Sequence, residues 1–321
     1  MNALEIKNLT KTFGHLKAVD EVSFVVPAGG IFGLIGRNGA GKTTIIRILM
    51  NIYEQDSGDI TFRGNPVGQA FRDRVGYMPE ERGLNGKMKV LDYLLFLAEL
   101  KGARIEKARD RAMAYLEQFD LVERAGKKIE ELSKGNQQKV QFISTILHDP
   151  EFIVLDEPFS GLDPVNTNLF KDIILDLKRA GKAIIFSTHL MDFAEKMCDH
   201  IALIHEGRLH LHGPLHEVKE RFSQSHVILH YEGNIAFLDQ LPYVVSVRDF
   251  GNYAGIEIRA RADSRQLLKD LINHDVLVKR YDANDISLHD IFVSLTHVGH
   301  DDPPLPVDGH AGMAPAFSLV N

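Results

Sequence analysis

The sequence predicts an α/β protein with a second, smaller α+β domain after it. Two observations predict the α/β part. Apolar strands bounded by turn residues alternate with stretches of helical periodicity, and a glycine-rich turn joins one such strand to a helix near residue 36. A third observation, a change of pattern after about Arg221, predicts the smaller domain. A chain of 321 residues is long enough for both domains.

The first domain is expected to span residues 1–220. Alternating residues from Leu4 to Ile6 and an apolar run at 22–26 predict its first strands. Pro27-Ala28-Gly29-Gly30 is a turn sequence that leads into a strand at 31–35. Apolar residues at helical spacing predict a helical subdomain at about 88–149. Further strands are expected at 152–155, 183–186 and 201–204, the first two buried on both faces as in a parallel sheet with helical crossovers, and the sheet as a whole is expected to be mixed.

The segment 224–297 is expected to form the second domain. Its strands and helices follow the order β-α-β-β-α-β, which is the order of a ferredoxin-like domain. A short helix at 288–295 follows the last strand. The proline and glycine content of residues 298–321 predicts a disordered tail.

Charge and apolar content limit the classes of function. The net charge of -7 argues against a protein that coats nucleic acid, so no nucleic-acid partner is expected. No apolar stretch approaches the ~20 residues of a membrane-spanning helix, and residues 1–11 show no signal-peptide core. Cys198 is the one cysteine, which excludes an internal disulfide and fits a reducing compartment. A cytoplasmic chain is expected, and another chain must supply any membrane part.

The glycine-rich turn has the sequence G-R-N-G-A-G-K-T-T and opens a predicted helix. It is a P-loop in the strand–turn–helix context that the motif requires. Glycines let backbone N–H groups approach phosphate oxygens, and the start of the helix contributes the positive end of its dipole. The lysine is expected to reach the β- and γ-phosphates, and the first threonine to bind Mg²⁺. The residues expected to hold the nucleotide here are Gly36, Asn38, Gly39, Gly41, Lys42, Thr43 and Thr44.

A second motif, F-I-V-L-D-E-P at 152–158, ends a buried strand with two acidic residues. Such residues face a ligand beyond the carboxyl edge of a parallel sheet. Asp156 is expected to hold Mg²⁺, directly or through water, and Glu157 to polarise the attacking water. The two motifs together predict a nucleoside triphosphatase.

Further segments distinguish the kind of triphosphatase. The sequence carries L-S-K-G-N-Q-Q from Leu132 to Gln138, S-G-L-D at 160–163 and S-T-H at 187–189. In this order and spacing the motifs resemble those of the ATP-binding cassette (ABC) ATPases over residues 1 to about 220. The resemblance implies an ABC-type P-loop fold, ATP and Mg²⁺ as cofactors, and ATP hydrolysis coupled to transmembrane transport.

The resemblance also implies roles for individual residues. Phe13 would stack on adenine, and His189 would contact the γ-phosphate and help to orient the water. Ser133 and Gly135 of one subunit would close over the γ-phosphate bound to the P-loop of its partner. The chain would therefore act as a homodimer, or as a heterodimer with a sibling subunit.

The sequence departs from the family pattern in two places. Lys134 and Asn136 replace one glycine and the glutamine of the signature L-S-G-G-Q, which leaves the turnover rate open. Glu80, in Y-M-P-E-E-R-G-L, stands where the family has its Q-loop glutamine. Its carboxylate is expected to bind Mg²⁺ or to stay protonated beside Asp156 and Glu157; the alternative is a solvated loop acid.

The Y-M-P-E-E-R-G-L run and the C-terminal S-L-H-D-I-F-V-S-L-T resemble an exporter-type branch of the family. Its ATPases pair with separate integral membrane permeases and serve sodium, drug or antibiotic efflux. This implies a peripheral place on the inner face of the cell membrane, with the permease docked between the Glu80 loop and the helix that begins at Val90. Two alternatives stay open: an ABC ATPase that acts on ribosomes or nucleic acid, and an ATP-binding regulatory module without turnover.

Overall fold

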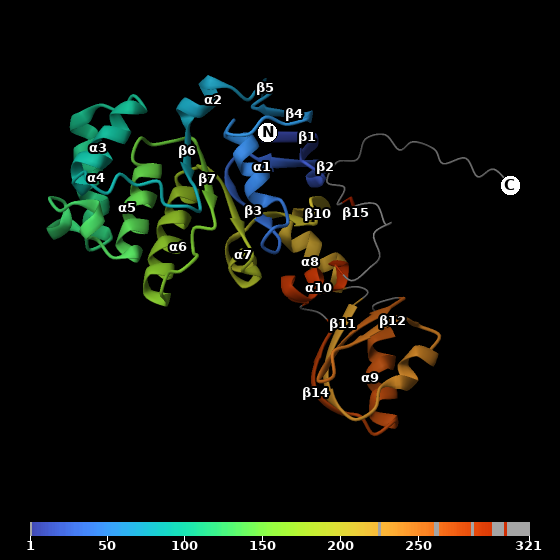
Figure 1. Ribbon diagram of the computed structural model, residues 1–321. Coiled ribbons are helices and arrows are strands. Elements are labelled where there is room, and N and C mark those ends of the chain that lie inside the picture. The colour runs from blue at the N-terminus through green and yellow to red at the C-terminus, as the bar shows by residue number, and fades with distance from the viewer. Residues whose placement is uncertain (1, 224–225, 260–262, 284–285, 297–304, 307–321) are drawn as a thin grey trace.

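The computed structural model describes residues 2–223, 226–259, 263–283, 286–296 and 305–306 (Figure 1). Up to residue 223 the elements are β1 (Asn2–Phe13), β2 (Leu16–Pro27), β3 (Gly30–Ile35), α1 (Lys42–Leu49), β4 (Ser57–Phe62), β5 (Asn65–Pro66), α2 (Gln69–Arg74), β6 (Val75–Met78), α3 (Val90–Leu100), α4 (Ile105–Gln118), η1 (Val122–Arg124), η2 (Ile129–Glu131), α5 (Lys134–Ile146), β7 (Phe152–Asp156), α6 (Pro164–Arg179), β8 (Ala183–Thr188), α7 (Met191–Met197), β9 (His200–His205), β10 (Arg208–Pro214) and α8 (Leu215–Ser223). The later elements are β11 (His226–Glu232), η3 (Ala236–Gln240), β12 (Val244–Asp249), β13 (Tyr253–Ile258), α9 (Asp263–Asn273), β14 (Leu277–Asp282), α10 (Leu288–Thr296) and β15 (Leu305–Pro306).

A mixed sheet of order β15-β10-β9-β3-β8-β7-β6 forms the centre of the first domain. Strands β9, β3, β8, β7 and β6 are parallel, whereas β10 pairs antiparallel with β9. Every residue of β7 and β8 is buried, as expected for inner strands that are covered on both faces. The predicted α/β class is confirmed.

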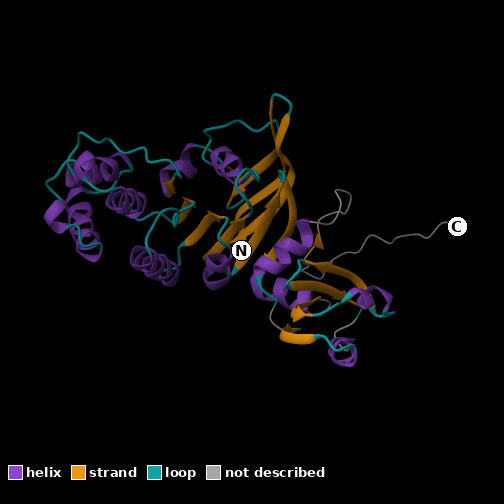
Figure 2. Ribbon diagram, turned by 60° about the horizontal axis from the view of Figure 1, so that its bottom comes forward, coloured by secondary structure: helices purple, strands orange, loops and turns teal. Residues whose placement is uncertain are grey.

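The two faces of this sheet belong to two different cores. Ile153 and Leu155 of β7 face a core that contains helices α3 to α7, whereas Phe152 and Val154 face the antiparallel sheet β2-β1-β4-β5 and α1. The alternation follows from the two-residue period of a strand. Helices α3, α4 and α5 form a group without strands beside the sheet, the predicted helical subdomain (Figures 1 and 2).

Helices α5 and α6 begin at capping residues that lie next to the functional loops. The Ser133 hydroxyl accepts a hydrogen bond from the Asn136 N–H at 3.3 Å. The Asp163 carboxylate accepts from the N–H groups of Val165 and Asn166, both at 3.0 Å. Side-chain acceptors of this kind satisfy amides at the start of a helix that have no partner within it.

The C-terminal sheet has the strand order β12-β13-β11-β14 and is antiparallel throughout. This is the ferredoxin-like arrangement that the sequence predicts. One face packs on α9 and η3 through a core that includes Val227, Leu229 and Leu267. The first predicted helix of the domain is only the short 3₁₀ segment η3.

The last helix, α10, packs with the first domain. Leu288, Ile291 and Phe292 share a core with residues of α7 and α8, and the Leu288 N–H donates to Glu195 Oε2 on α7 at 3.0 Å. The predicted tail, 298–321, lies outside the described residues except at 305–306, which form β15 rather than disordered chain and pair with β10. In the part of the chain that the structure describes, no helix combines the length and apolarity needed to cross a membrane.

Candidate active site

The P-loop connects β3 to α1 and curves tightly between them. Gly41 has a φ of +106°, and a Cβ there would lie 2.4 Å from the Ala18 carbonyl oxygen, so only glycine fits. Among the described residues, none accepts a backbone hydrogen bond from the amides of Asn38, Gly39 or Gly41. Donor groups at the start of a helix suit the binding of phosphate.

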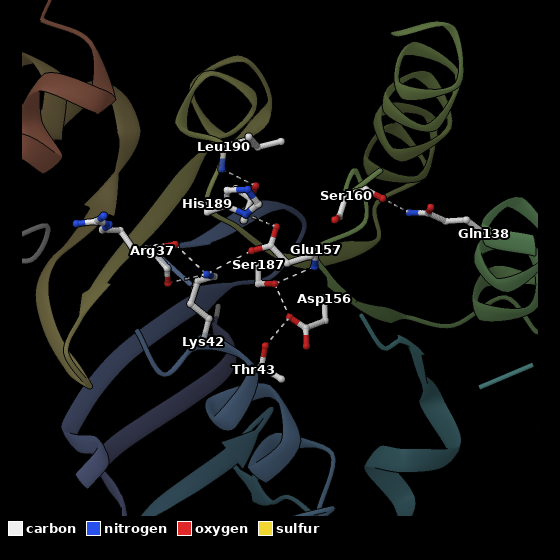
Figure 3. A network of polar contacts seen from close by, with 12 residues as sticks. Arg37, Lys42, Thr43, Gln138, Asp156, Glu157, Ser160, Ser187, His189 and Leu190 are labelled. Carbon is white, nitrogen blue, oxygen red and sulfur yellow. Dashed lines mark hydrogen bonds and ion pairs between the residues drawn. The ribbon is translucent and has the colours of Figure 1, made fainter. Parts of the chain in front are cut away.

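Lys42, the first residue of α1, points back into this loop (Figure 3). Its ammonium group donates to the carbonyl oxygens of Gly36 at 2.8 Å and Arg37 at 3.2 Å, and lies 3.3 Å from Glu157 Oε1. Both charged side chains are buried, which strengthens their interaction relative to a pair in water. The structure thus joins the P-loop to the acidic end of β7.

Ser187 at the end of β8 links the two acidic residues (Figure 3). Its hydroxyl donates to Asp156 Oδ1 at 2.5 Å and accepts from the Glu157 N–H at 2.9 Å. The two strands place Asp156 and Ser187 side by side in register. Ser187 had no predicted role, although it begins the S-T-H motif directly after the predicted strand at 183–186.

The surroundings of Asp156 fit Mg²⁺. The Thr43 hydroxyl donates to Asp156 Oδ1 at 3.3 Å, whereas Oδ2 is buried and has no hydrogen-bond partner. Burial raises the pKa of Asp156. No described group of three or more His, Cys, Asp or Glu side chains is placed to hold a metal, but Mg²⁺ usually takes one or two protein carboxylates together with substrate phosphates. An unpartnered carboxylate oxygen beside a threonine hydroxyl is a suitable donor set.

Glu157 is held from three sides. Its backbone has a φ of +50°, which is unusual for a residue other than glycine, and its side chain is 6% exposed. The two carboxylate oxygens face different neighbours: Oε1 faces the ammonium group of Lys42, and Oε2 lies 3.0 Å from Nδ1 of His189. A carboxylate fixed in this way can accept a proton from a water molecule. The structure therefore brings together Lys42, Asp156, Glu157 and His189.

Phe13 lies at the end of β1 with its ring 42% exposed. It packs edge-on against Tyr53, with a centroid separation of 5.3 Å, and the Lys11 ammonium group lies 5.5 Å from its centroid. Tyr53 in turn accepts a hydrogen bond from Arg47 of α1. The exposed ring is available for stacking, but its role toward adenine stays a prediction.

Three predicted site residues lie apart from this cluster. Ser133 is exposed and Gly135 half-buried at the start of α5, and neither makes a described hydrogen bond to the P-loop. Such a position is compatible with action on the nucleotide of a partner, which stays a prediction. Glu80 is exposed and makes no hydrogen bond or ion pair within the described residues. The structure does not bring Glu80 to Asp156.

Two buried glutamines of α5 also escaped the sequence analysis. Gln138 Nε2 donates to the carbonyl oxygens of Pro158 at 2.9 Å and Ser160 at 3.3 Å, directly after Glu157. Gln141 Nε2 donates to the loop that carries Glu80, at Pro79 and Glu81. The signature motif ends at Gln138, and no sequence pattern distinguishes Gln141 from the other polar residues of the helix.

Comparison with known proteins was made for the sequence and for the fold. Residues 19–160 match the ABC transporter family, and residues 213–296 match the C-terminal domain of DrrA1-3-like ATP-binding proteins. Among solved structures, an ATP-binding subunit of an ABC transporter superposes with a TM-score of 0.65 at 30% identity, over 68% of this chain and 93% of that one.

Relatives of similar length match across both domains. The ABC transporter ATP-binding protein YhaQ of Bacillus subtilis (strain 168) is 40% identical over 90% of this chain and 97% of its own length. The Nod factor export ATP-binding protein I of Rhizobium sp. (strain N33) is 32% identical, over 86% of this chain and 96% of its own length.

Proposed function

The chain belongs to the ATP-binding proteins of ABC transporters, and from this membership we propose that it drives export through a separate permease subunit. It binds ATP and hydrolyses it to power transport. The observation that carries the proposal is the convergence of Lys42, Asp156, Glu157 and His189 at one edge of the central sheet. The direction of transport rests on the export relative and on the exporter-type C-terminal segment.

Each residue of the cluster has a proposed task. The P-loop amides and Lys42 hold the phosphates of ATP. Glu157 takes a proton from the attacking water, because its carboxylate is fixed and buried at the end of β7. His189, in contact with that carboxylate, orients the water, and Ser187 keeps Glu157 in place through its backbone.

Mg²⁺ would be held by Thr43 and by the unpartnered oxygen of Asp156. When bound, it supplies positive charge that neutralises the phosphate oxygens. Glu80 stays a candidate ligand only if its loop turns inward, because its side chain is exposed here.

Two copies, or this chain and a sibling, form the working unit in this proposal. The exposed start of α5 would present Ser133 and Gly135 to the γ-phosphate on the partner's P-loop. A second set of donors excludes water from the γ-phosphate and strengthens each local charge interaction. ATP would therefore favour the closed dimer, and hydrolysis would release it.

The permease is proposed to dock beside α3, with the chain on the inner face of the membrane. Phe96 and Leu100 lie one turn apart on α3, and their side chains are 48% and 69% exposed. Large apolar side chains of this kind mark protein contact surfaces when they gather on one face. The Glu80 loop follows β6 and precedes α3, so the two elements adjoin in sequence.

Co-purification tests this docking. The tagged chain is isolated from membranes in mild detergent, as wild type, as Leu100→Glu, and as the control Leu277→Glu, which alters an exposed apolar residue of β14. We expect an integral membrane protein with the wild type and the control, and much less with Leu100→Glu. Absence of any membrane protein from all three would refute the transport proposal, while phosphate release by the purified chain would still report the ATPase.

A further inference from the structure

Helix α5 holds two loops that lie far apart in sequence. One is the docking loop, residues 79–82, which carries Glu80; the other is the post-Glu157 loop, residues 158–163. Residues 138 and 141 are three positions apart and so share one face of the helix. Gln138 contacts the second loop and Gln141 the first.

Both glutamine side chains are buried and hydrogen-bonded to these loops. Gln138 is 4% and Gln141 5% exposed, and each donates through Nε2 to two carbonyl oxygens of its loop. Leaving a buried amide without hydrogen-bond partners destabilises the folded protein, so these bonds resist separation of each loop from the helix.

A third contact closes the connection. Arg82 of the docking loop donates through Nη2 to Gln138 Oε1 at 3.4 Å, so the glutamine that holds the post-Glu157 loop also touches the docking loop (Figure 3 shows Gln138 beside Ser160). Further along α5, the Thr145 hydroxyl donates to the Tyr77 carbonyl oxygen at 3.4 Å, in strand β6 just before the docking loop.

We propose that Gln138 and Gln141 are positioning residues that bind the docking loop and the post-Glu157 loop to α5 as one unit. A movement of the docking loop is then passed through α5 to the peptide that follows the general base, and to the Ser133 end of the same helix. The proposal rests on the ATPase activity and not on the proposed docking, because the coupling lies within one chain.

Amide hydrogen exchange on the purified full chain tests this coupling. Gln141→Met keeps the length of the side chain, removes both bonds to the docking loop, and touches nothing in the post-Glu157 loop. We expect faster exchange of the amides at 159–163, by about tenfold or more, as for segments that open together. We also expect kcat to fall about tenfold or more with the Kd for Mg·ATP within about twofold, since positioning affects the reacting geometry.

Gln137→Met is the matched control. Gln137 lies on the same helix and also donates to two carbonyl oxygens, those of Ile129 and Leu132, which belong to neither loop. In Gln137→Met, faster amide exchange should be confined to residues 129–133. The reciprocal variant, Gln138→Met, should accelerate exchange in the docking loop, because coupling between two sites acts in both directions.

Two results would overturn the proposal. One is faster exchange confined to residues 79–83 in Gln141→Met. The other is a Gln141→Met variant whose free energy of unfolding falls as much as that of Gln137→Met while its kcat is unchanged. Gln141 would then have only a structural role. If Gln141→Met does not fold, the coupling is tested instead by amide hydrogen exchange of the wild-type chain at increasing denaturant concentration. The two loops must then open together, and independent opening refutes the coupling.

Discussion

Replacing Ser187 with alanine should damage the site without removing any side chain that is proposed to hold the nucleotide or the metal. The hydroxyl is fully buried, donates to Asp156 Oδ1 and accepts from the Glu157 N–H. Alanine leaves this N–H buried without a partner, which costs about 1–3 kcal/mol, and removes a hydrogen bond to a carboxylate, worth about 1.5–3 kcal/mol. We expect the free energy of unfolding to fall by roughly 3 kcal/mol at neutral pH.

Catalysis should fall as well. The bond from the Glu157 N–H fixes a residue whose backbone is in the left-handed region. A misplacement of about 1 Å at a reacting group costs on the order of 100-fold, so we expect kcat to drop at least tenfold. The Kd for ATP should change little, because Lys42 and the P-loop do not contact Ser187 in the described structure.

Ser23→Ala is the matched control for this experiment. Ser23 on β2 accepts from the Asn8 N–H at 2.7 Å and donates to Asn8 Oδ1 at 3.0 Å, so it also accepts one bond and donates one, at the surface and to a neutral amide oxygen. Water can replace both, and we expect a loss of about 1 kcal/mol or less. Urea unfolding and steady-state phosphate release are measured for both variants. Equal stability and equal turnover in the two would refute the assigned role of Ser187.

Further substitutions separate binding, hydrolysis and folding. Lys42→Ala should abolish ATP binding in an equilibrium titration, and Glu157→Gln should keep binding but cut phosphate release by about 100-fold or more and trap a closed dimer. Burial raises the pKa of Asp156 above 3.8, so stability is lost progressively as the pH rises from 3.8 through the raised pKa, and the full loss is present above it. Asp156→Asn should therefore be more stable than wild type to urea at pH 7, by a margin that shrinks as the pH falls toward 3.8, while Mg²⁺-dependent binding is lost. Glu195→Ala removes the acceptor for the Leu288 N–H and should cost about 1–2 kcal/mol in urea unfolding.

The parts of the site that sequence reasoning finds are those whose chemistry lies in contiguous residues. The P-loop must follow a strand and begin a helix, so this local pattern is enough to identify its glycines and Lys42. Asp156 and Glu157 end an apolar strand, and the carboxyl ends of parallel strands meet at one edge of the sheet. The β-α-β-β-α-β order of the second domain can likewise be predicted, because each strand and helix is a contiguous segment of sequence.

What sequence reasoning misses depends on distant contacts. Gln141 lies 62 residues from Pro79, and the residues around Gln141 do not predict which carbonyl oxygens will accept hydrogen bonds from its amide. Glu80 has the same difficulty. Its place in the motif allowed a metal ligand, a protonated acid or a solvated loop acid, and no local pattern chooses among them. Gln141 holds the backbone carbonyl oxygens on either side of Glu80 against α5, and its side chain is exposed, as expected for a solvated loop acid.

The apolar face of α10 could be predicted from its spacing, but not the surface that it covers. It packs on α7, and α7 is tied to the active site at two points. His189 lies two residues before α7 begins, and Phe193 of α7 stacks on Phe159, two residues after Glu157, with centroids 5.1 Å apart and an interplanar angle of 16°. A chain cut after α8 would therefore lose part of the core beneath its own catalytic loops, so slow turnover by such a fragment would report a damaged core rather than the absence of a regulatory domain.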